Sequence, residues 1–284
     1  MLQLSHIRIR DPFVLLEDDT YYMYASAANA GPVEREGFNV YRSQDLQNWE
    51  GPFRVFDPAP DFWADRDFWA PEVHKYKGRF YMFASFKAEG VHRGSQILVA
   101  DSPMGPFSPL SDGPITPAGW DCLDATLFVD KEGRPYTFYC HEWMQITDGT
   151  MVCQKLTDDL TAPAGEPVTL FKASDPEWSI PYERDCYVTD APFLHWTTDG
   201  RLLMIWSSYG KKGYVQAQAE SLTGKPEGPW KQLSPIFMED GGHGMIFTDK
   251  AGKRRLALHQ PNGGNLERAR FFYLVEKDGR LAAE

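Results

Sequence analysis

DPFVLLEDDTYYMYAS, residues 11–26, aligns without a gap with APEVHKYKGRFYMFAS, residues 70–85. In both stretches a proline is followed by an apolar run, a short polar turn and an aromatic-rich run that ends in Ala-Ser. Two strand-like runs joined by a tight polar turn are the signature of a β-hairpin. The chain therefore carries at least two copies of one hairpin.

Three further copies follow, and the five copies begin at residues 11, 70, 124, 190 and 243. Each copy precedes a second strand-rich unit that ends in turn residues. About four strands per repeat of roughly 40–50 residues are typical of a β-propeller blade, with the extra length placed in loops such as 27–36 and 173–185. The sequence therefore predicts an all-β fold, a single five-bladed β-propeller over residues 1–284 with four-stranded antiparallel blades around a central channel. The N-terminal LQLSHIRI is expected to complete the ring.

The composition narrows the class of ligand. A net charge of −11 argues against a nucleic acid or an anionic membrane as partner, because both need clustered Lys and Arg. No window approaches the 18 apolar residues of a membrane span, and MLQLSHIRIR lacks the apolar core of a signal peptide, so we expect a cytoplasmic protein. The four cysteines lack metal-site spacing and are expected to be reduced, mostly buried thiols. The oligomeric state stays open.

Acidic residues open several of the repeats. In a propeller the first strand of each blade lines the channel, so equivalent positions from all blades converge. Glu72 points to the same face as the opening position of its own repeat, because side chains alternate along a strand. Carboxylates crowded on an axis repel each other and lose solvent, which costs stability, so a functional site explains the set better than strand capping does. The opening positions are Asp11, Ala70, Asp124, Asp190 and His243.

Polar groups and tryptophans are expected at the same mouth of the ring. His141 and Glu142 end a second strand, and Trp69 and Trp143 lie beside such positions. An aromatic face next to acids suits a sugar ring, whose C–H face stacks while its hydroxyls form hydrogen bonds. Core packing is the alternative role for each tryptophan. The sequence thus indicates a carbohydrate as the ligand, with Trp69, Glu72, His141 and Trp143 as candidate contacts.

The segments RDPFV, FWAPEV, LDATLFVD, TDAPFL and GGHGMIF, in this order, resemble glycoside hydrolase family 43 from about Ile9 to Phe272. That family comprises five-bladed propellers that hydrolyse arabinofuranosides and xylosides with inversion. The resemblance implies that Asp11 is the general base and that Asp124 orients the general acid and modulates its pKa. It also implies that His243, on the axis, helps to hold a metal ion, usually calcium, through water; no other cofactor is expected.

One position departs from the family pattern. Most members carry Glu-Gly-Pro at the general acid, whereas this chain carries Asp190-Ala191-Pro192. Asp is one methylene shorter, which withdraws the carboxyl by ~1.5 Å. The resemblance therefore implies Asp190 as a shortened general acid, with Glu142 as the first alternative acid, followed by Glu72 and Glu183.

Three functions stay open at this point. The first is a hydrolase that releases terminal α-L-arabinofuranosyl or β-D-xylosyl residues from plant-type oligo- or polysaccharides. The second is a related glycoside phosphorylase, which needs a cationic cluster at the mouth, for example Arg10, Arg66, Arg93 and His141. The third is a non-catalytic carbohydrate-binding propeller, which the change at Asp190 favours. The presence of both Asp11 and Asp124 favours catalysis.

Overall fold

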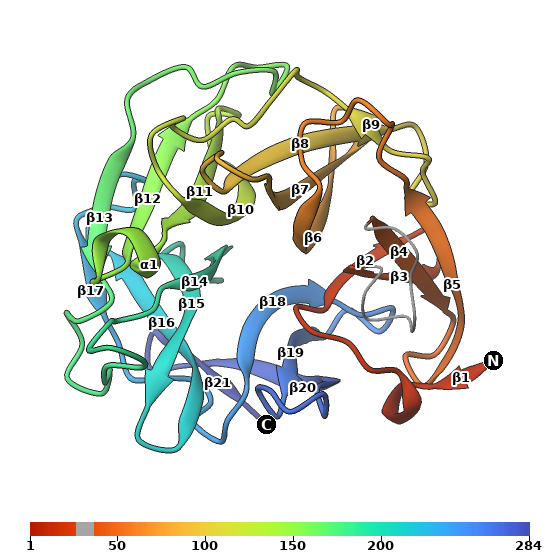
Figure 1. Cartoon of the computed structure of the whole chain (residues 1–284). Helices are drawn as coiled ribbons and strands as arrows, with labels where there is room; N and C mark the ends of the chain where they lie inside the picture. Colours follow the sequence, from red (N-terminus) through yellow and green to blue (C-terminus); the bar gives the residue numbers. More distant parts are fainter. Residues whose placement is uncertain (27–36) are drawn as a thin grey trace.

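The computed structural model describes residues 1–26 and 37–284, and the predicted loop at 27–36 lies outside them. The described residues form five antiparallel sheets arranged as a ring around one axis (Figure 1). The five-bladed propeller predicted from the repeats is therefore confirmed. Two short helical segments, η1 (Leu4–His6) and α1 (Trp143–Ile146), lie between strands.

Each sheet is built from one continuous stretch of chain. The first contains β1 (Leu2–Gln3), β2 (Phe13–Glu17), β3 (Thr20–Ser26), β4 (Phe38–Ser43) and β5 (Asn48–Phe56). The second contains β6 (Arg66–Tyr76), β7 (Arg79–Lys87), β8 (Gly94–Ala100) and β9 (Ser108–Pro109). The third contains β10 (Cys122–Val129), β11 (Pro135–His141), β12 (Thr150–Lys155) and β13 (Val168–Lys172). The fourth contains β14 (Asp190–Trp196), β15 (Leu202–Gly210), β16 (Gly213–Ser221) and β17 (Trp230–Gln232). The fifth contains β18 (Gly242–Thr248), β19 (Arg254–Gln260), β20 (Arg268–Lys277) and β21 (Arg280–Ala283).

A one-residue irregularity recurs where the innermost strands begin. In the second to fifth blades the pairing of the first two strands shifts by one residue near the start of the hairpin. One residue at the start of each of the five copies has a positive φ, which L-residues other than glycine seldom adopt. These residues are Asp11 (51°), Ala70 (46°), Asp124 (56°), Ala191 (52°) and His243 (51°).

This irregularity corrects the repeat alignment in the fourth blade. Ala191 has the positive φ, and it directly follows Asp190, whose pairing with Ser207 is the last before the bulge. The structural equivalent of Asp11 is therefore Ala191, and Asp190 lies one residue earlier. A bulge bends the backbone locally, so side chains one residue apart at the bulge enter the channel in different directions.

The N-terminal segment joins the first and last blades, as predicted. Its strand β1 pairs with β5 of its own blade. The residues that follow β1 make the contacts to the last blade. The Ile9 N–H donates to the Glu267 carbonyl oxygen (3.3 Å), Arg268 Nε donates to the Ser5 carbonyl oxygen (2.9 Å), and Arg8 and Arg10 both pair with the buried Glu267 carboxylate. Backbone contacts and ion pairs thus join the first and last blades.

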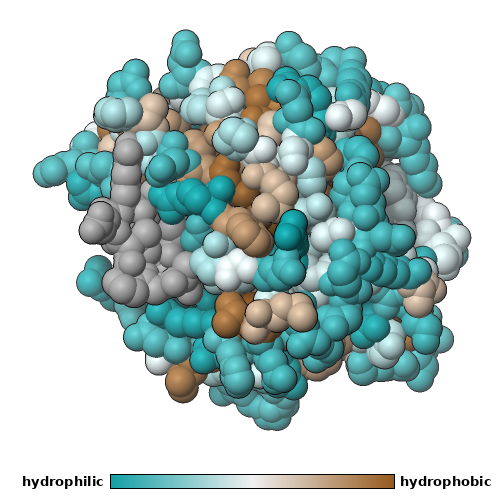
Figure 2. All heavy atoms as spheres, turned by 90° about the vertical axis from the view of Figure 1, so that its right-hand side faces the viewer, coloured by the Kyte–Doolittle hydropathy of each residue, from teal (hydrophilic) through white to brown (hydrophobic). Residues whose placement is uncertain are grey.

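Apolar side chains fill the space between neighbouring sheets. One cluster runs through the first, second and fifth blades and includes Trp49, Phe86 and Met245, so the core continues across the closing boundary. All four cysteines are buried and free, as predicted. The side of the molecule shown in Figure 2 is mostly hydrophilic, with hydrophobic residues in a few small groups. No helix in the described part of the chain is long and apolar enough to cross a membrane.

Candidate active site

A cavity of about 500 Å³ opens at the end of the ring where the innermost strands begin. The structure brings together here the opening residues Asp11, Asp124, Asp190 and His243. Strand starts from different blades and the short helix α1 supply most of the lining. The remaining lining residues are Arg10, Asp67, Phe68, Trp69, Leu123, Glu142, Trp143, Met144, Tyr182, Val188 and Tyr209.

Asp11 lies where the first and last blades meet. Its N–H donates to Nδ1 of His259 (3.2 Å), and its Oδ1 lies 3.0 Å from Nδ1 of His243. Burial would raise the pKa of Asp11, but the neighbouring histidines and the Arg10 guanidinium outweigh it and hold that pKa well below its usual range. Burial lowers the pKa of His243 to about 4, so His243 is neutral near pH 7 and Arg10 supplies the lasting positive charge. Asp11 is therefore a carboxylate at neutral pH.

Asp124 and Asp190 form a pair with the opposite tendency. Asp124 is buried, and its Oδ2 accepts the Ala191 N–H (3.0 Å). Burial, reinforced by the charges of Asp190 and Asp11, raises the pKa of Asp124 well above its usual range. Asp190 Oδ2 accepts a hydrogen bond from the Tyr214 hydroxyl (2.7 Å). Burial raises the pKa of Asp190 to about 7, with Asp11 adding to the shift and the Tyr214 hydrogen bond opposing it.

Asp11 and the pair Asp124 and Asp190 can therefore divide the base and acid roles between them. The pair Asp124 and Asp190 keeps a proton near neutral pH, because the charge of one disfavours ionisation of the other in a site with little solvent. Asp11, beside the Arg10 guanidinium, carries no proton at neutral pH. Environments that push the pKa values of two carboxyls apart are how one cavity holds both a proton donor and a proton acceptor.

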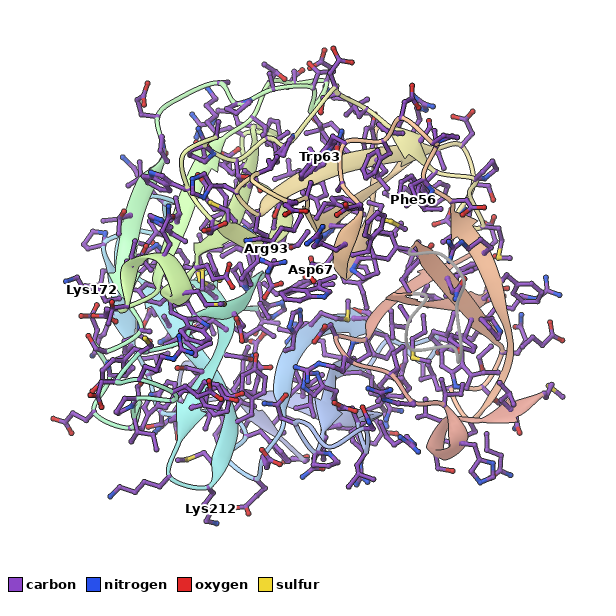
Figure 3. All side chains as sticks on the ribbon, viewed as in Figure 1. Phe56, Trp63, Asp67, Arg93, Lys172 and Lys212 are labelled. Atoms are coloured by element: carbon purple, nitrogen blue, oxygen red, sulfur yellow. The ribbon has the colours of Figure 1, made fainter. Side chains whose placement is uncertain are left out.

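Glu142, the predicted alternative acid, also lines the cavity but is held by a cation. Its Oε2 accepts a hydrogen bond from Nε of Arg93 (3.1 Å), and both residues are buried. Nη2 of Arg93 donates to Oδ2 of Asp67 (3.0 Å), and Figure 3 shows these two residues near the centre of the ring. Glu142 is thus held in a buried ion pair with Arg93.

Aromatic side chains form one wall of the cavity. Tyr182 stacks on Tyr209 with ring centroids 4.1 Å apart and meets Trp143 edge-on at 6.1 Å. Trp69 also lines the cavity and is 41% exposed, and the Arg93 guanidinium lies 3.9 Å from its ring centroid. These flat, exposed faces can stack on a sugar ring. The sequence analysis did not identify the three tyrosines of the site, Tyr182, Tyr209 and Tyr214.

Two predicted sugar contacts lie away from the cavity lining. His141 stacks on Trp120 with ring centroids 4.2 Å apart, and its Nε2 lies 2.7 Å from Oε1 of Gln145. Glu72 is buried within the ring, with its Oε2 3.1 Å from Nε2 of His74. Both side chains therefore have protein partners where the sequence analysis expected ligand contacts.

Known proteins resemble this chain along almost its whole length. The model of the family described as glycosyl hydrolases family 43 matches residues 4–276. This chain belongs to glycoside hydrolase family 43. It is therefore a glycoside hydrolase with a carbohydrate substrate, as predicted.

Relatives of this family 43 chain include enzymes named for arabinan and for xylan. The extracellular exo-alpha-(1->5)-L-arabinofuranosidase ArbA of Cellvibrio japonicus (strain Ueda107) is 26% identical over 281 residues, covering 89% of this chain and 74% of the relative. The solved structure titled endo-arabinase from Bacteroides thetaiotaomicron VPI-5482 is 40% identical, covers 99% of both chains and superposes with a TM-score of 0.92. A structure titled endo-1,4-beta-xylanase from the same organism is 26% identical, covers 99% of this chain and 95% of its own, and has a TM-score of 0.82.

The family 43 resemblance also implied a metal ion near His243. Nδ1 of His243 lies against Asp11 and 3.8 Å from Oδ2 of Asp124. Among the residues that the structure describes, no three His, Cys, Asp or Glu side chains are grouped to hold an ion. Calcium prefers six to eight oxygen ligands, so the protein groups here do not form a direct calcium site. An ion held through water stays a prediction, and no chemical step is derived from it.

Proposed function

We propose that this glycoside hydrolase cleaves terminal glycosidic bonds in a single displacement with inversion, using Asp11 as general base and Asp190 as general acid. One observation carries the proposal: within a single cavity Asp11 is held ionised while Asp190 shares its buried surroundings with a second acid, Asp124. In this assignment Asp124 is a positioning residue, because it bonds the peptide N–H next to Asp190.

The reaction needs two proton transfers and one bond exchange. Asp11 takes a proton from water as the water oxygen attacks the anomeric carbon. The bond from that carbon to the leaving oxygen breaks, and Asp190 gives its proton to the leaving oxygen.

The names of the relatives favour an L-arabinofuranosyl substrate over a D-xylosyl one. Two of the three relatives reported above are named for arabinan or arabinofuranoside cleavage. A terminal α-L-arabinofuranosyl residue is thus the first candidate substrate and a β-D-xylosyl residue the second.

The cationic side chains at the mouth argue against the phosphorylase alternative. Arg10 pairs with Glu267 and hydrogen bonds to Asn262, and Arg93 pairs with Glu142 and Asp67. A phosphate in the cavity would compete with carboxylates for both guanidinium groups.

The test is hydrolysis of aryl α-L-arabinofuranosides and aryl β-D-xylosides by the wild type, Asp11→Ala, Asp190→Ala and Glu142→Ala. Loss of the base should abolish turnover with any leaving group. Loss of the acid should slow substrates with poor leaving groups far more than nitrophenyl glycosides, which need little protonation. That dependence in Glu142→Ala alone would move the acid to Glu142.

A wild type that cleaves neither glycoside would overturn the sugar assignment. Thermal protection by a neutral sugar without any hydrolysis would instead support the carbohydrate-binding alternative.

A further inference from the structure

At three of the five positive-φ positions the N–H is bonded to a side chain of the preceding blade. The Asp124 N–H donates to Ser85 Oγ at 2.9 Å, the His243 N–H to Ser207 Oγ at 2.8 Å and the Asp11 N–H to His259 Nδ1 at 3.2 Å. Each acceptor lies on the second strand of the preceding blade and is buried. The three acceptors share one register position, because they pair with Trp69, Asp190 and Gly242, each one residue before a positive-φ residue.

The third blade breaks this pattern. Cys140 occupies the same register position, paired with Leu123, and is fully buried. The peptide N–H that would face it belongs to Ala191, and this N–H donates to Oδ2 of Asp124 at 3.0 Å. Sulfur is a weak hydrogen-bond acceptor, unlike the serine oxygen or the imidazole nitrogen in the other blades.

We propose that Cys140 is a positioning residue for the general acid: by not capturing the Ala191 N–H, it leaves that N–H to Asp124. Asp124 is thereby tied to the backbone beside Asp190, the residue that donates the proton. The inference rests on the proposed role of Asp190 and adds a residue that lies outside the cavity lining.

A hydroxyl at this position would restore the pattern of the other blades. It would compete with Asp124 for the Ala191 N–H, as Ser85 and Ser207 already bind the equivalent groups. The net contribution of one hydrogen bond corresponds to about a tenfold change in a rate, so loss of this bond should slow acid-assisted turnover roughly tenfold.

The test compares Cys140→Ser with Cys140→Ala and with Cys153→Ser. Cys153 is buried in the same apolar cluster, on β12, and controls for placing a hydroxyl in this core. We expect Cys140→Ser to lower kcat roughly tenfold for a phenyl glycoside while leaving KM and nitrophenyl hydrolysis near wild type. Cys140→Ala offers no acceptor and should retain wild-type turnover. Equal losses in Cys140→Ser and Cys140→Ala, or in Cys153→Ser, would overturn the proposal, as would wild-type behaviour of Cys140→Ser.

A crystal structure of Cys140→Ser tests the hydrogen bond without any activity. The proposal requires the new hydroxyl oxygen within hydrogen-bond distance of the Ala191 nitrogen and Asp124 Oδ2 withdrawn from it. If Asp124 keeps the Ala191 N–H, the proposal is wrong even where the variant is slow. If the wild type hydrolyses no glycoside, the proposed function fails, whereas the structure still decides this inference.

Discussion

Replacing Asp190 with asparagine should stabilise the protein, and the gain should grow as the pH rises. Burial raises the pKa of Asp190 from 3.8 to about 7 in the folded protein. A carboxyl whose pKa is raised by folding contributes fully to protein stability below its unfolded-state pKa. This contribution is lost as the pH rises from the unfolded-state pKa to the folded-state pKa. Asparagine has a similar shape and cannot ionise, so it escapes this loss.

The size of the stability gain depends on how much of the interval between the unfolded-state and folded-state pKa of Asp190 lies between pH 5 and pH 8. About two pKa units lie between pH 5 and the folded value, and each unit corresponds to about 1.4 kcal/mol. Asp190 is half-buried, so solvent reduces the effect, and we expect roughly 2 kcal/mol. The free energy of unfolding of Asp190→Asn minus that of the wild type should widen by this amount from pH 5 to pH 8.

Urea denaturation of both proteins at the two pH values measures this difference directly. Asp112→Asn, at an exposed carboxyl, is the control and should show no such widening. A difference between Asp190→Asn and wild type that stays constant with pH would refute the reasoning. Asp190 would then titrate as an ordinary carboxyl and could not serve as the acid near neutral pH.

Four further outcomes are expected. The value of kcat/KM should stay level from about pH 4 to pH 6, because Asp11 remains ionised, and fall about tenfold per pH unit above about 7 as Asp190 loses its proton; a profile that rises through pH 8 would contradict this. Tyr214→Phe removes a hydrogen bond that lowers the pKa of Asp190, so the alkaline limb should move to higher pH, and a move to lower pH would count against the assignment. Trp69→Ala should raise KM about fivefold through loss of a stacking face, whereas Trp69→Phe should keep most of the affinity, and equal KM values in all three proteins would remove Trp69 from the sugar site. Dialysis against EDTA should leave kcat unchanged, because the described residues form no direct metal site; a loss restored by calcium would support the water-held ion predicted at His243.

The blades could be predicted from the sequence because their hairpins are local. The hairpin at 11–26 pairs Phe13 with Tyr24 and Glu17 with Thr20, as the turn in the sequence requires. The segment that closes the ring was predicted, but the residue pairs that close it could not be predicted in this way. The closing depends on pairs such as Arg10 with Glu267 and Arg268 with the Ser5 carbonyl, which are more than 250 positions apart. The local sequence of β1 or of β20 does not indicate which distant segment lies beside it in the ring.

The convergence of the acids also followed from the repeats, but their detailed placement did not. Asp11 and Asp190 both lie just before a proline in the sequence, yet a bulge of one residue separates their structural positions. The ion pair of Glu142 with Arg93, 49 positions apart, joins the third blade to the second. No periodicity along the chain marks such an ion pair, because it forms between different blades.

The boundary between the first and last blades has a consequence for the order of folding. Asp11 obtains its partners His243 and His259 from the fifth blade, whereas each sheet is made from consecutive residues. Contacts that are near in sequence form faster than those between distant segments. During renaturation the circular-dichroism signal of the β-sheets should therefore return before catalysis. The time at which turnover returns reports when the two ends of the chain come together.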